Sequence, residues 1–132
     1  MTYQELLFDE DQILHLYNAN HWTAYTKDKD TLFKGIIQSL DTLACYDNDQ
    51  LVGLIRTVGD GHTMVYILDI LVHPDYHRQG IGRTLINKIL TKYTHVRQIH
   101  LATDNTPEQQ AFYEAVGFQQ YGDAGLVGYK RK

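Results

Sequence analysis

The stretch from residue 63 to residue 93 constrains the fold more than any other part of the sequence. It opens with the run TMVYILDILV, which is apolar on both faces except at Asp69 and therefore predicts a central strand. The chain then turns at Pro74 and passes two glycines, Gly80 and Gly82, before a helical pattern begins. A further strand at 97–103 would lie parallel to the first, through a right-handed crossover. The pattern predicts an amphipathic helix, because apolar residues share one stripe: Ile81, Leu85, Ile86, Ile89, Leu90 and Tyr93.

The rest of the chain predicts a mixed sheet around this unit. Two strands separated by the turn DND precede it, so residues 42–72 form an antiparallel meander. The fold class is therefore α/β, an α+β mixed sheet in which the antiparallel meander is followed by a splayed parallel strand pair with a crossover helix. We expect the other elements as follows: a strand at 4–8, helices at 9–20 and 31–40 with a loop between them, strands at 42–46 and 50–58, a helix from Pro107 to Gly117, and a final strand at 125–132.

Composition and charge narrow the class of protein. A length of 132 residues predicts a single domain, 1–132. The net charge of -4 argues against a nucleic-acid partner, which needs a basic face. The single cysteine, Cys45, excludes an internal disulfide and is consistent with a reducing compartment. The first residues lack a signal-peptide pattern, and no apolar run nears the ~18 residues of a membrane helix, so we expect a cytoplasmic protein with no membrane partner.

The glycines before the predicted helix indicate an anion site. A helix N-terminus presents unpaired backbone N–H groups and the positive end of the helix dipole. Glycine lets a phosphate approach that backbone, and Arg78 and Arg83 add positive charge. The segment is not a Walker loop, because no Gly-Lys-Ser/Thr follows, and it is not a dinucleotide fingerprint, because Leu85 stands where the third glycine would be. The simpler alternative is a turn into a packing helix.

The order of strand, proline turn, Arg-Gln-Gly-Ile-Gly-Arg and helix resembles the acyl-CoA pyrophosphate loop of the GNAT superfamily of N-acetyltransferases. The family has Gln or Arg at the first loop position, where this sequence has His77. The segment ILDILVHPDY resembles the family's fourth strand, and AFYEAVGF resembles its second signature. The order of elements implies a GNAT-like fold over nearly the whole chain. The resemblance implies these cofactor-binding residues: His77, Arg78, Gln79, Gly80, Ile81, Gly82, Arg83 and, offset by one residue from the family position, Asn105.

The resemblance also implies a reaction. Acetyl-CoA would be the co-substrate, and a primary amine on a small molecule or a peptide would attack its thioester directly. A bulge in the fourth strand would free the N–H groups near Ile70, Leu71 and Val72 for the developing oxyanion. Tyr113 of AFYEAVGF would protonate the departing thiolate. The resemblance leaves a homodimer open.

Some of these residues have structural alternatives. Asp69 is a candidate base, but strand alternation points it away from the substrate-facing Leu68 unless a bulge reverses the parity. We favour a structural role, because a buried carboxylate needs hydrogen bonds. The alternative for Tyr113 is that it simply packs beside its neighbours on the helix. Trp22 and Tyr25 could wall the acceptor pocket.

Two functional alternatives also remain at this stage. The chain could be a non-catalytic acyl-CoA-binding or sensor domain, or a protein-interaction module of the same fold. No metal is expected, because Pro74 places His73 and His77 in a turn and the sequence has no H-E-x-x-H motif or cysteine pair. The acceptor amine itself carries no signature in the sequence.

Overall fold

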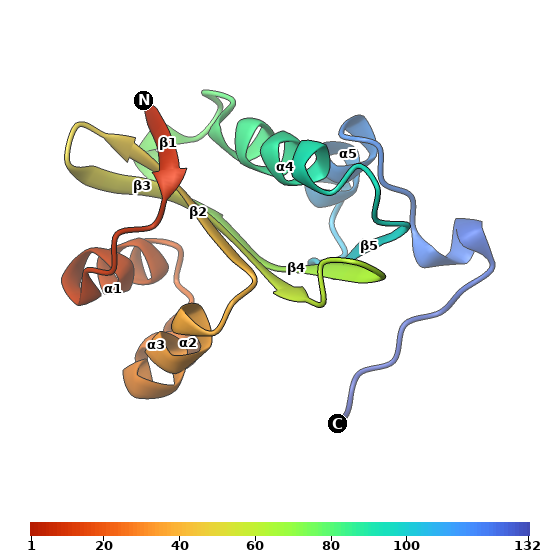
Figure 1. Cartoon of the computed structure of the whole chain (residues 1–132), viewed down its shortest axis with the longest axis horizontal. Coiled ribbons are helices and arrows are strands. Elements are labelled where there is room, and N and C mark those ends of the chain that lie inside the picture. Colours follow the sequence, from red (N-terminus) through yellow and green to blue (C-terminus); the bar gives the residue numbers. More distant parts are fainter. The chain divides into compact units, whose positions relative to one another are not determined.

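The computed structural model describes all 132 residues, and these form two compact units, residues 1–102 and residues 103–132. The first unit contains a five-stranded sheet and four α-helices (Figure 1). Its elements are β1 (Thr2–Glu5), α1 (Glu10–Ala19), α2 (Thr23–Thr26), α3 (Lys29–Ile37), β2 (Asp41–Asp47), β3 (Gln50–Gly59), β4 (Met64–Val72), the 3-10 turn η1 (Pro74–Tyr76), α4 (Ile81–Lys92) and β5 (Gln98–Leu101). The second unit contains α5 (Pro107–Ala115) and the 3-10 turn η2 (Tyr121–Ala124).

The sheet has the predicted mixed topology. Its strand order is β1-β2-β3-β4-β5, and each strand pairs with its neighbours in sequence. The first four strands are antiparallel, whereas β4 and β5 are parallel and are joined through α4. The predicted meander and the parallel pair with its crossover helix are therefore both confirmed.

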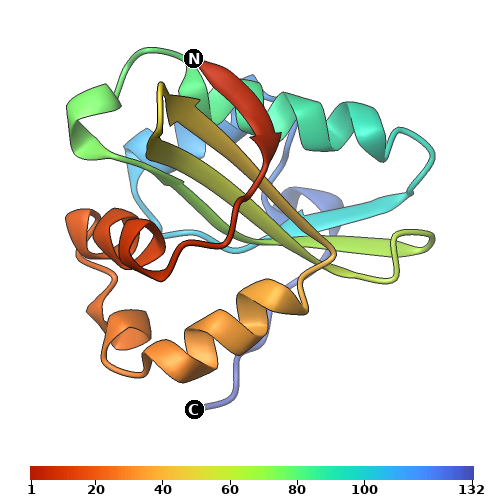
Figure 2. The same cartoon turned by 60° about the vertical axis from the view of Figure 1, so that its left-hand side comes forward.

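Helices cover both faces of this sheet (Figures 1 and 2). Helix α4 packs on one face, where Ile81 and Leu85 approach Gly53 of β3. Helices α1 and α3 pack on the other face, where their apolar side chains form one cluster with β2, β3 and β4. Its fully or nearly fully buried members include Ile13, Leu16, Tyr17, Leu32, Phe33, Ile36, Leu54 and Leu71. This two-sided cover explains why β3 and β4 carry so few polar residues.

The ends of the helices follow ordinary capping chemistry. Asp9 caps α1, because its carboxylate accepts from the backbone N–H of Gln12 at 3.2 Å. Thr106 caps α5 in the same way, with Pro107 at the first helical position as predicted. Gly117 follows that helix with φ +98°, a conformation that favours glycine.

Three expectations for local structure were wrong. The first strand is Thr2–Glu5 rather than 4–8, and the loop expected at 21–30 contains α2 and the start of α3. Helix α3 therefore begins at Lys29 rather than at residue 31, with Asp28 at its N-cap position. Residues 125–132 form no strand, because glycines at 125 and 128 weaken strand structure and Gly125 adopts φ +76°.

The sheet opens along the last part of β4. Strand β5 pairs only with Met64 to Ile67, so no strand lies beside the rest of that edge of β4. On the other edge, Arg56 pairs with Asp69 and Thr57 pairs with Ile67, which leaves Leu68 without a partner on β3. A bulge is therefore present, but two residues before the predicted position near Ile70.

Candidate functional site

The loop between β4 and α4 is fixed at its start. The backbone N–H of His73 donates to the Val52 carbonyl at 2.8 Å, and the Tyr76 hydroxyl donates to Asp47 at 2.6 Å. His77 turns back to the end of β4, where its Nε2 lies 2.9 Å from the Val72 carbonyl. A carbonyl only accepts, so this nitrogen carries the proton and donates. His77 thus anchors the loop through its Nε2–H group.

The backbone after His77 has the geometry of an anion nest. Arg78 has φ +64° and Gly80 has φ +78°, while the residues on either side have negative φ, so the sign alternates along the loop. Such alternation turns successive N–H groups toward one side, where they can bind an anion. Gly80 has no atom within 4 Å of the place a Cβ would occupy, so conformation alone favours glycine there.

Helix α4 continues this site with free donors. Its first backbone bond runs from Thr84 to the Gly80 carbonyl at 3.0 Å, so the N–H groups of Ile81, Gly82 and Arg83 have no acceptor within the helix. No side chain caps this end. The side chains of Arg78 and Arg83 are exposed and form no salt bridge. The predicted loop residues are therefore gathered at one helix N-terminus with several unpaired donors.

Gly53 sets the distance between this helix and the sheet. A Cβ at this position would lie 2.9 Å from Ile81 Cγ2 and 3.3 Å from Leu85 Cδ1. A side chain in that space would force Ile81, Leu85 or the helix that carries them to shift. The close packing of α4 on β3 fixes its first turn beside the end of β4.

The open edge of β4 lies next in the chain to this loop. Ile70, Leu71 and Val72 pair in register with β3, and the divergence of β5 leaves their other edge without a strand. The divergence of β5 therefore leaves their outward N–H groups without a strand partner. The predicted cause, a bulge near Ile70, was wrong, because these residues pair with β3 in regular register. The open edge and the glycine loop are two separate groups of backbone donors, because the N–H groups of residues 73–77 between them are already hydrogen-bonded or, at Pro74, absent.

Asp69 is the centre of a buried hydrogen-bond network. Its carboxylate accepts from Arg56 Nε at 2.8 Å, from the Tyr17 hydroxyl at 2.8 Å and from the Tyr25 hydroxyl at 3.2 Å. Arg56 Nη2 also lies 2.7 Å from the same carboxylate. Burial opposes the charge on Arg56, but the neighbouring carboxylate outweighs it and raises the pKa of the guanidinium. Asp69 thus acts as the acceptor that holds α1 and α2 to the sheet.

The bulge at Leu68 explains why Asp69 faces these helices. Ile67 and Asp69 pair with adjacent residues of β3, so they point to opposite faces instead of the same face. The parity reversal considered for the sequence is therefore real. Leu68 is 39% exposed, whereas Asp69 is 2% exposed.

A cleft of about 280 Å³ opens between α2, α3 and the bulged part of the sheet. Tyr25 lines it, whereas Trp22 packs against Tyr17 and Tyr25 outside the lining. Sequence reasoning missed the other contributors, although an arginine inside an apolar strand and a glycine inside a helix were both visible signals. The cleft is lined by Ala24, Tyr25, Asp28, Thr31, Leu32, Gly35, Arg56 and Leu68.

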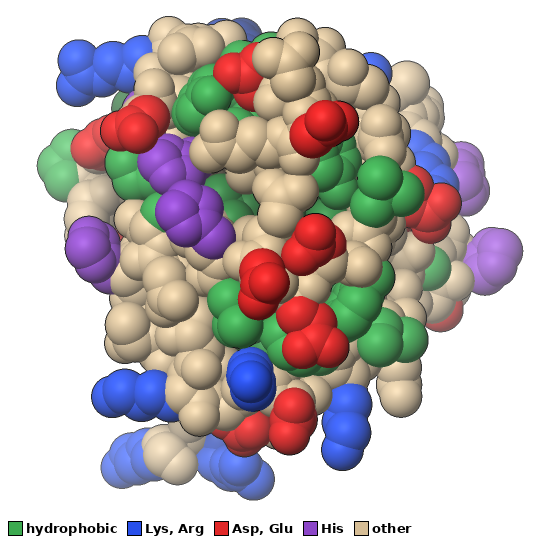
Figure 3. All heavy atoms as spheres, turned by 90° about the vertical axis from the view of Figure 1, so that its left-hand side faces the viewer, with side chains coloured by type: hydrophobic (Ala, Val, Ile, Leu, Met, Phe, Trp, Pro, Cys, Tyr) green, Lys and Arg blue, Asp and Glu red, His purple; other side chains and the backbone are tan.

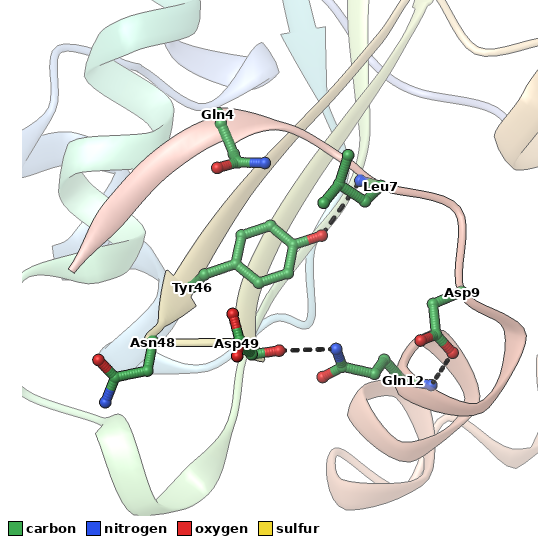
Figure 4. A pocket seen from close by; sticks show the side chains of 7 residues that line it. All are labelled: Gln4, Leu7, Asp9, Gln12, Tyr46, Asn48 and Asp49. Atoms are coloured by element: carbon green, nitrogen blue, oxygen red, sulfur yellow. Dashed lines mark hydrogen bonds between the residues drawn. The ribbon is translucent and has the colours of Figure 1, made fainter.

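A second cavity of about 270 Å³ lies between β1, α1 and the β2–β3 turn (Figure 4). Its polar groups bond to one another. Gln12 Nε2 donates to the Asp49 carbonyl at 2.8 Å, and the Leu7 N–H donates to the Tyr46 hydroxyl at 3.1 Å. Gln12 Oε1 also accepts from the Leu51 N–H at 2.7 Å. We interpret this cavity as part of the contact that ties α1 to the β2–β3 turn.

A pair of stacked histidines lies on the α1 side of the first unit. The rings of His15 and His73 are 5.5 Å apart with an interplanar angle of 22°. Figure 3, which looks onto the side where α1 lies in Figure 1, shows histidines gathered near acidic side chains. No group of three or more His, Cys, Asp or Glu side chains is arranged to hold a metal ion.

The second unit contains the other two predicted site residues. Tyr113 lies on α5, packs edge-on against Phe112 and Phe118, and has a pKa raised to about 12 by burial. Asn105 precedes that helix, and its side-chain oxygen accepts from Gln110 at 2.6 Å. A tyrosine with a raised pKa keeps its proton at neutral pH, which a proton donor requires.

The fold is a mixed sheet that opens along the end of β4, with a glycine loop at the N-terminus of α4. The model of the acetyltransferase (GNAT) domain family matches residues 38–120. The chain therefore belongs to the GNAT acetyltransferase family, as the sequence resemblance implied.

Relatives and solved structures agree with this assignment. The chain is 29% identical to an uncharacterized N-acetyltransferase of Pyropia yezoensis over 64% of this chain and 49% of that protein. A GNAT-family acetyltransferase of Streptococcus pneumoniae has a TM-score of 0.87 and 34% identity, with 99% of this chain and 95% of that chain covered. An aminoglycoside 6'-N-acetyltransferase complexed with coenzyme A has a TM-score of 0.67, covers 89% of this chain and 84% of that chain, and shares the fold at 19% identity. The chain spans about half the length of the curated relatives it matches, or less. No helix has the length and apolar character to cross a bilayer.

Proposed function

We propose that the chain is an N-acetyltransferase that transfers the acetyl group of acetyl-CoA to a primary amine by direct attack. The observation that carries this proposal is the group of free backbone donors at the N-terminus of α4, which follows the edge of β4 that no strand covers. Its nest and its two unpaired arginines fit the pyrophosphate of coenzyme A. Within this proposal the loop from His77 to Arg83 binds the cofactor, and His77 acts mainly as the loop's anchor.

The chemistry assigned to β4 follows from its free edge. When an amine attacks a thioester, the carbonyl oxygen gains negative charge. The outward N–H groups among Ile70, Leu71 and Val72 are donors to that oxygen in this proposal. They belong to a strand that is hydrogen-bonded to β3 on its other side, so they need little reorganisation as the charge develops.

Tyr113 is the proton donor to the thiolate in this proposal. The support is its place in AFYEAVGF, which resembles the family's second signature. Asn105, offset from its family position, is a weaker candidate for a cofactor contact, because its side chain already accepts from Gln110.

The amine must lose a proton before it attacks. An amine with a pKa of ~10.4 is neutral in only about one molecule in a thousand or fewer at pH 7, a handicap of roughly 4–5 kcal/mol. Asp69 is a poor candidate for the base, because its carboxylate already accepts from Tyr17, Tyr25 and Arg56. We therefore propose that water carries this proton away.

The engagement of the Asp69 carboxylate in hydrogen bonds also favours a second candidate function. With Asp69 engaged in the network, a non-catalytic acyl-CoA-binding domain on the same fold remains the alternative.

Under either function we propose an amine or peptide ligand, with no nucleic acid or membrane partner. We also propose that the chain can form a homodimer. The single buried Cys45 supports a reducing compartment such as the cytoplasm, although two plant relatives carry chloroplastic names.

Turnover separates the two functions. The release of coenzyme A thiol from acetyl-CoA should be followed with a panel of primary amines and without any amine. The proposed function predicts release that depends on the amine and yields one acetylated amine for each thiol. Binding of acetyl-CoA with no amine-dependent release would support the non-catalytic alternative.

A further inference from the structure

The cleft beside the bulge carries polar groups that the transfer chemistry does not use. Arg56 lies at its inner side and is only 4% exposed. Its Nε and Nη2 are engaged with Asp69, and Nη2 also lies 3.5 Å from the Tyr25 hydroxyl. Nη1 donates to no protein atom. Because no fully buried side-chain nitrogen or oxygen lacks a partner, Nη1 must be open to the cleft that Arg56 lines.

Gly35 keeps this nitrogen accessible. Glycine is unfavourable inside a helix, yet it occupies the middle of α3. A Cβ at Gly35 would lie 3.1 Å from Arg56 Nη1, closer than most side-chain contacts. The missing side chain leaves room for a ligand atom beside the guanidinium. The mid-helix glycine and the open nitrogen therefore point to the same binding position.

Asp28 supplies the opposite charge at the same cleft. Its side chain is exposed and forms no salt bridge, and its only hydrogen bond is accepted from Thr31 Oγ1 at 2.8 Å. The charge of Arg56 is balanced by Asp69, so Asp28 gives the cleft a net negative charge. A cation is favoured near Asp28, and a neutral or anionic oxygen is favoured near Arg56.

The rest of the lining is apolar. Ala24, Leu32 and Leu68 contribute to the wall, and Tyr25 contributes its ring. A water molecule takes about 30 Å³ of liquid, so a cleft of this volume holds a group the size of one amino acid. An aliphatic side chain would replace water against this wall.

We propose that this cleft selects acceptors that carry an ammonium group close to a carbonyl or carboxylate oxygen, which is the head of an amino acid or the N-terminus of a peptide. Asp28 recognises the ammonium group, Arg56 Nη1 donates to the oxygen, and the apolar wall takes an aliphatic side chain. The inference rests on the proposed function in identifying this ligand as the acceptor. A plain alkylamine lacks the oxygen and is the disfavoured ligand.

The first test is binding rather than turnover. NMR titrations with coenzyme A present should compare leucinamide with isopentylamine, which is the same molecule without its carboxamide. A hydrogen bond from a charged donor predicts that leucinamide binds about tenfold more tightly or better. Signals of the residues that line the cleft should move. Equal affinity for the two ligands, or no binding of leucinamide, would overturn the proposal.

Variants assign the contacts. Asp28→Asn keeps the acceptor for Thr31 and should weaken leucinamide about two- to fivefold, the range of an exposed ion pair. The control is Asp30→Asn. Asp30 is an exposed acid in the first turn of α3, the helix that follows Asp28, and its substitution should leave binding unchanged. Gly35→Ala crowds Arg56 Nη1 and should weaken leucinamide more than isopentylamine. If Gly35→Ala weakens both ligands equally, Nη1 does not contact the oxygen and the proposal is wrong.

Turnover then distinguishes this inference from the proposed function. Rates should be compared per neutral amine, because an α-amine has a pKa of about 8 and an alkylamine one of about 10.4. Selective binding of leucinamide without thiol release would contradict acetyl transfer while supporting the cleft. Release with isopentylamine at an equal or better corrected rate would support acetyl transfer and overturn the cleft's selectivity. Leucine and a leucine-initiated peptide identify the source of the head group, and a preference for either supports the proposal.

Discussion

The buried ion pair of Arg56 and Asp69 offers the sharpest prediction about the fold. Asp69→Asn removes the charge that balances a guanidinium only 4% exposed. Breaking a buried pair from one side costs about 3–5 kcal/mol. Asparagine keeps one oxygen that can accept from the Tyr17 hydroxyl, so we expect the lower end, about 3 kcal/mol. With a urea m-value of about 2 kcal/mol per molar, the unfolding midpoint should fall by about 1.5 M.

A double variant identifies the cause of this loss. Arg56→Met combined with Asp69→Asn removes both charges and leaves the amide oxygen for the tyrosines. If the loss comes from an unbalanced charge, the double variant should be more stable than the sum of the two single changes predicts, by about 1–3 kcal/mol. Urea unfolding of the parent protein, of Arg56→Met, of Asp69→Asn and of the double variant measures this difference directly. Additive single effects would refute the reasoning. A fall in kcat of more than about a hundredfold in folded Asp69→Asn would indicate general-base catalysis and contradict the structural role.

Three further predictions concern catalysis, pH and packing. Tyr113→Phe keeps the ring, so acetyl-CoA affinity should be unchanged while kcat and kcat/KM fall together by about a hundredfold; a parent-like kcat, with chemistry shown to be rate-limiting, would exclude Tyr113 as the acid. Burial opposes the charge on Asp41, but hydrogen bonds, above all from Lys92, outweigh it and lower its pKa, so its contribution to stability is present above the unfolded pKa and is lost as pH falls through the folded one. Asp41→Asn should therefore lower the free energy of unfolding at pH 7 and flatten its acid dependence below about pH 4, and an unchanged acid limb would contradict this. Gly53→Ala should cost about 1–3 kcal/mol in urea unfolding because α4 must move, whereas Gly122→Ala, with no atom within 4 Å, should cost far less; equal losses would refute the packing argument.

The sequence predicted the regular elements that periodicity and chain order determine. The apolar run of β4 and the stripe of α4 gave a strand and a helix in the correct positions, and the order of elements gave the parallel pair. The glycine loop was also predictable, because Gly80 and Gly82 mark the start of a helical pattern, where Gly80 takes the N-cap position and Gly82 lies in the first turn. The family resemblance covered the same segment.

The rest depended on tertiary contacts. The bulge at Leu68 cannot be located from alternation, because its position is set by how β4 pairs with β3. The partners of Asp69 come from α1, α2 and β3, which are distant in sequence. The cleft was missed for the same reason, since Gly35 and Arg56 become neighbours only in the folded chain.

The central claim is that the glycine loop binds acetyl-CoA, and thermal unfolding with saturating acetyl-CoA tests it most directly. At a hundred times its dissociation constant a ligand stabilises the folded state by about 2.7 kcal/mol. For a domain of this size that corresponds to a rise in Tm of roughly 10 °C. Gly82→Asp places a negative charge at the site while remaining favourable to the helix N-terminus, so it should abolish the rise without unfolding the protein. Thr91→Asp, the same charge at the other end of α4, should keep the rise. An unchanged Tm for the parent protein, or an equal rise in Gly82→Asp, would contradict the account.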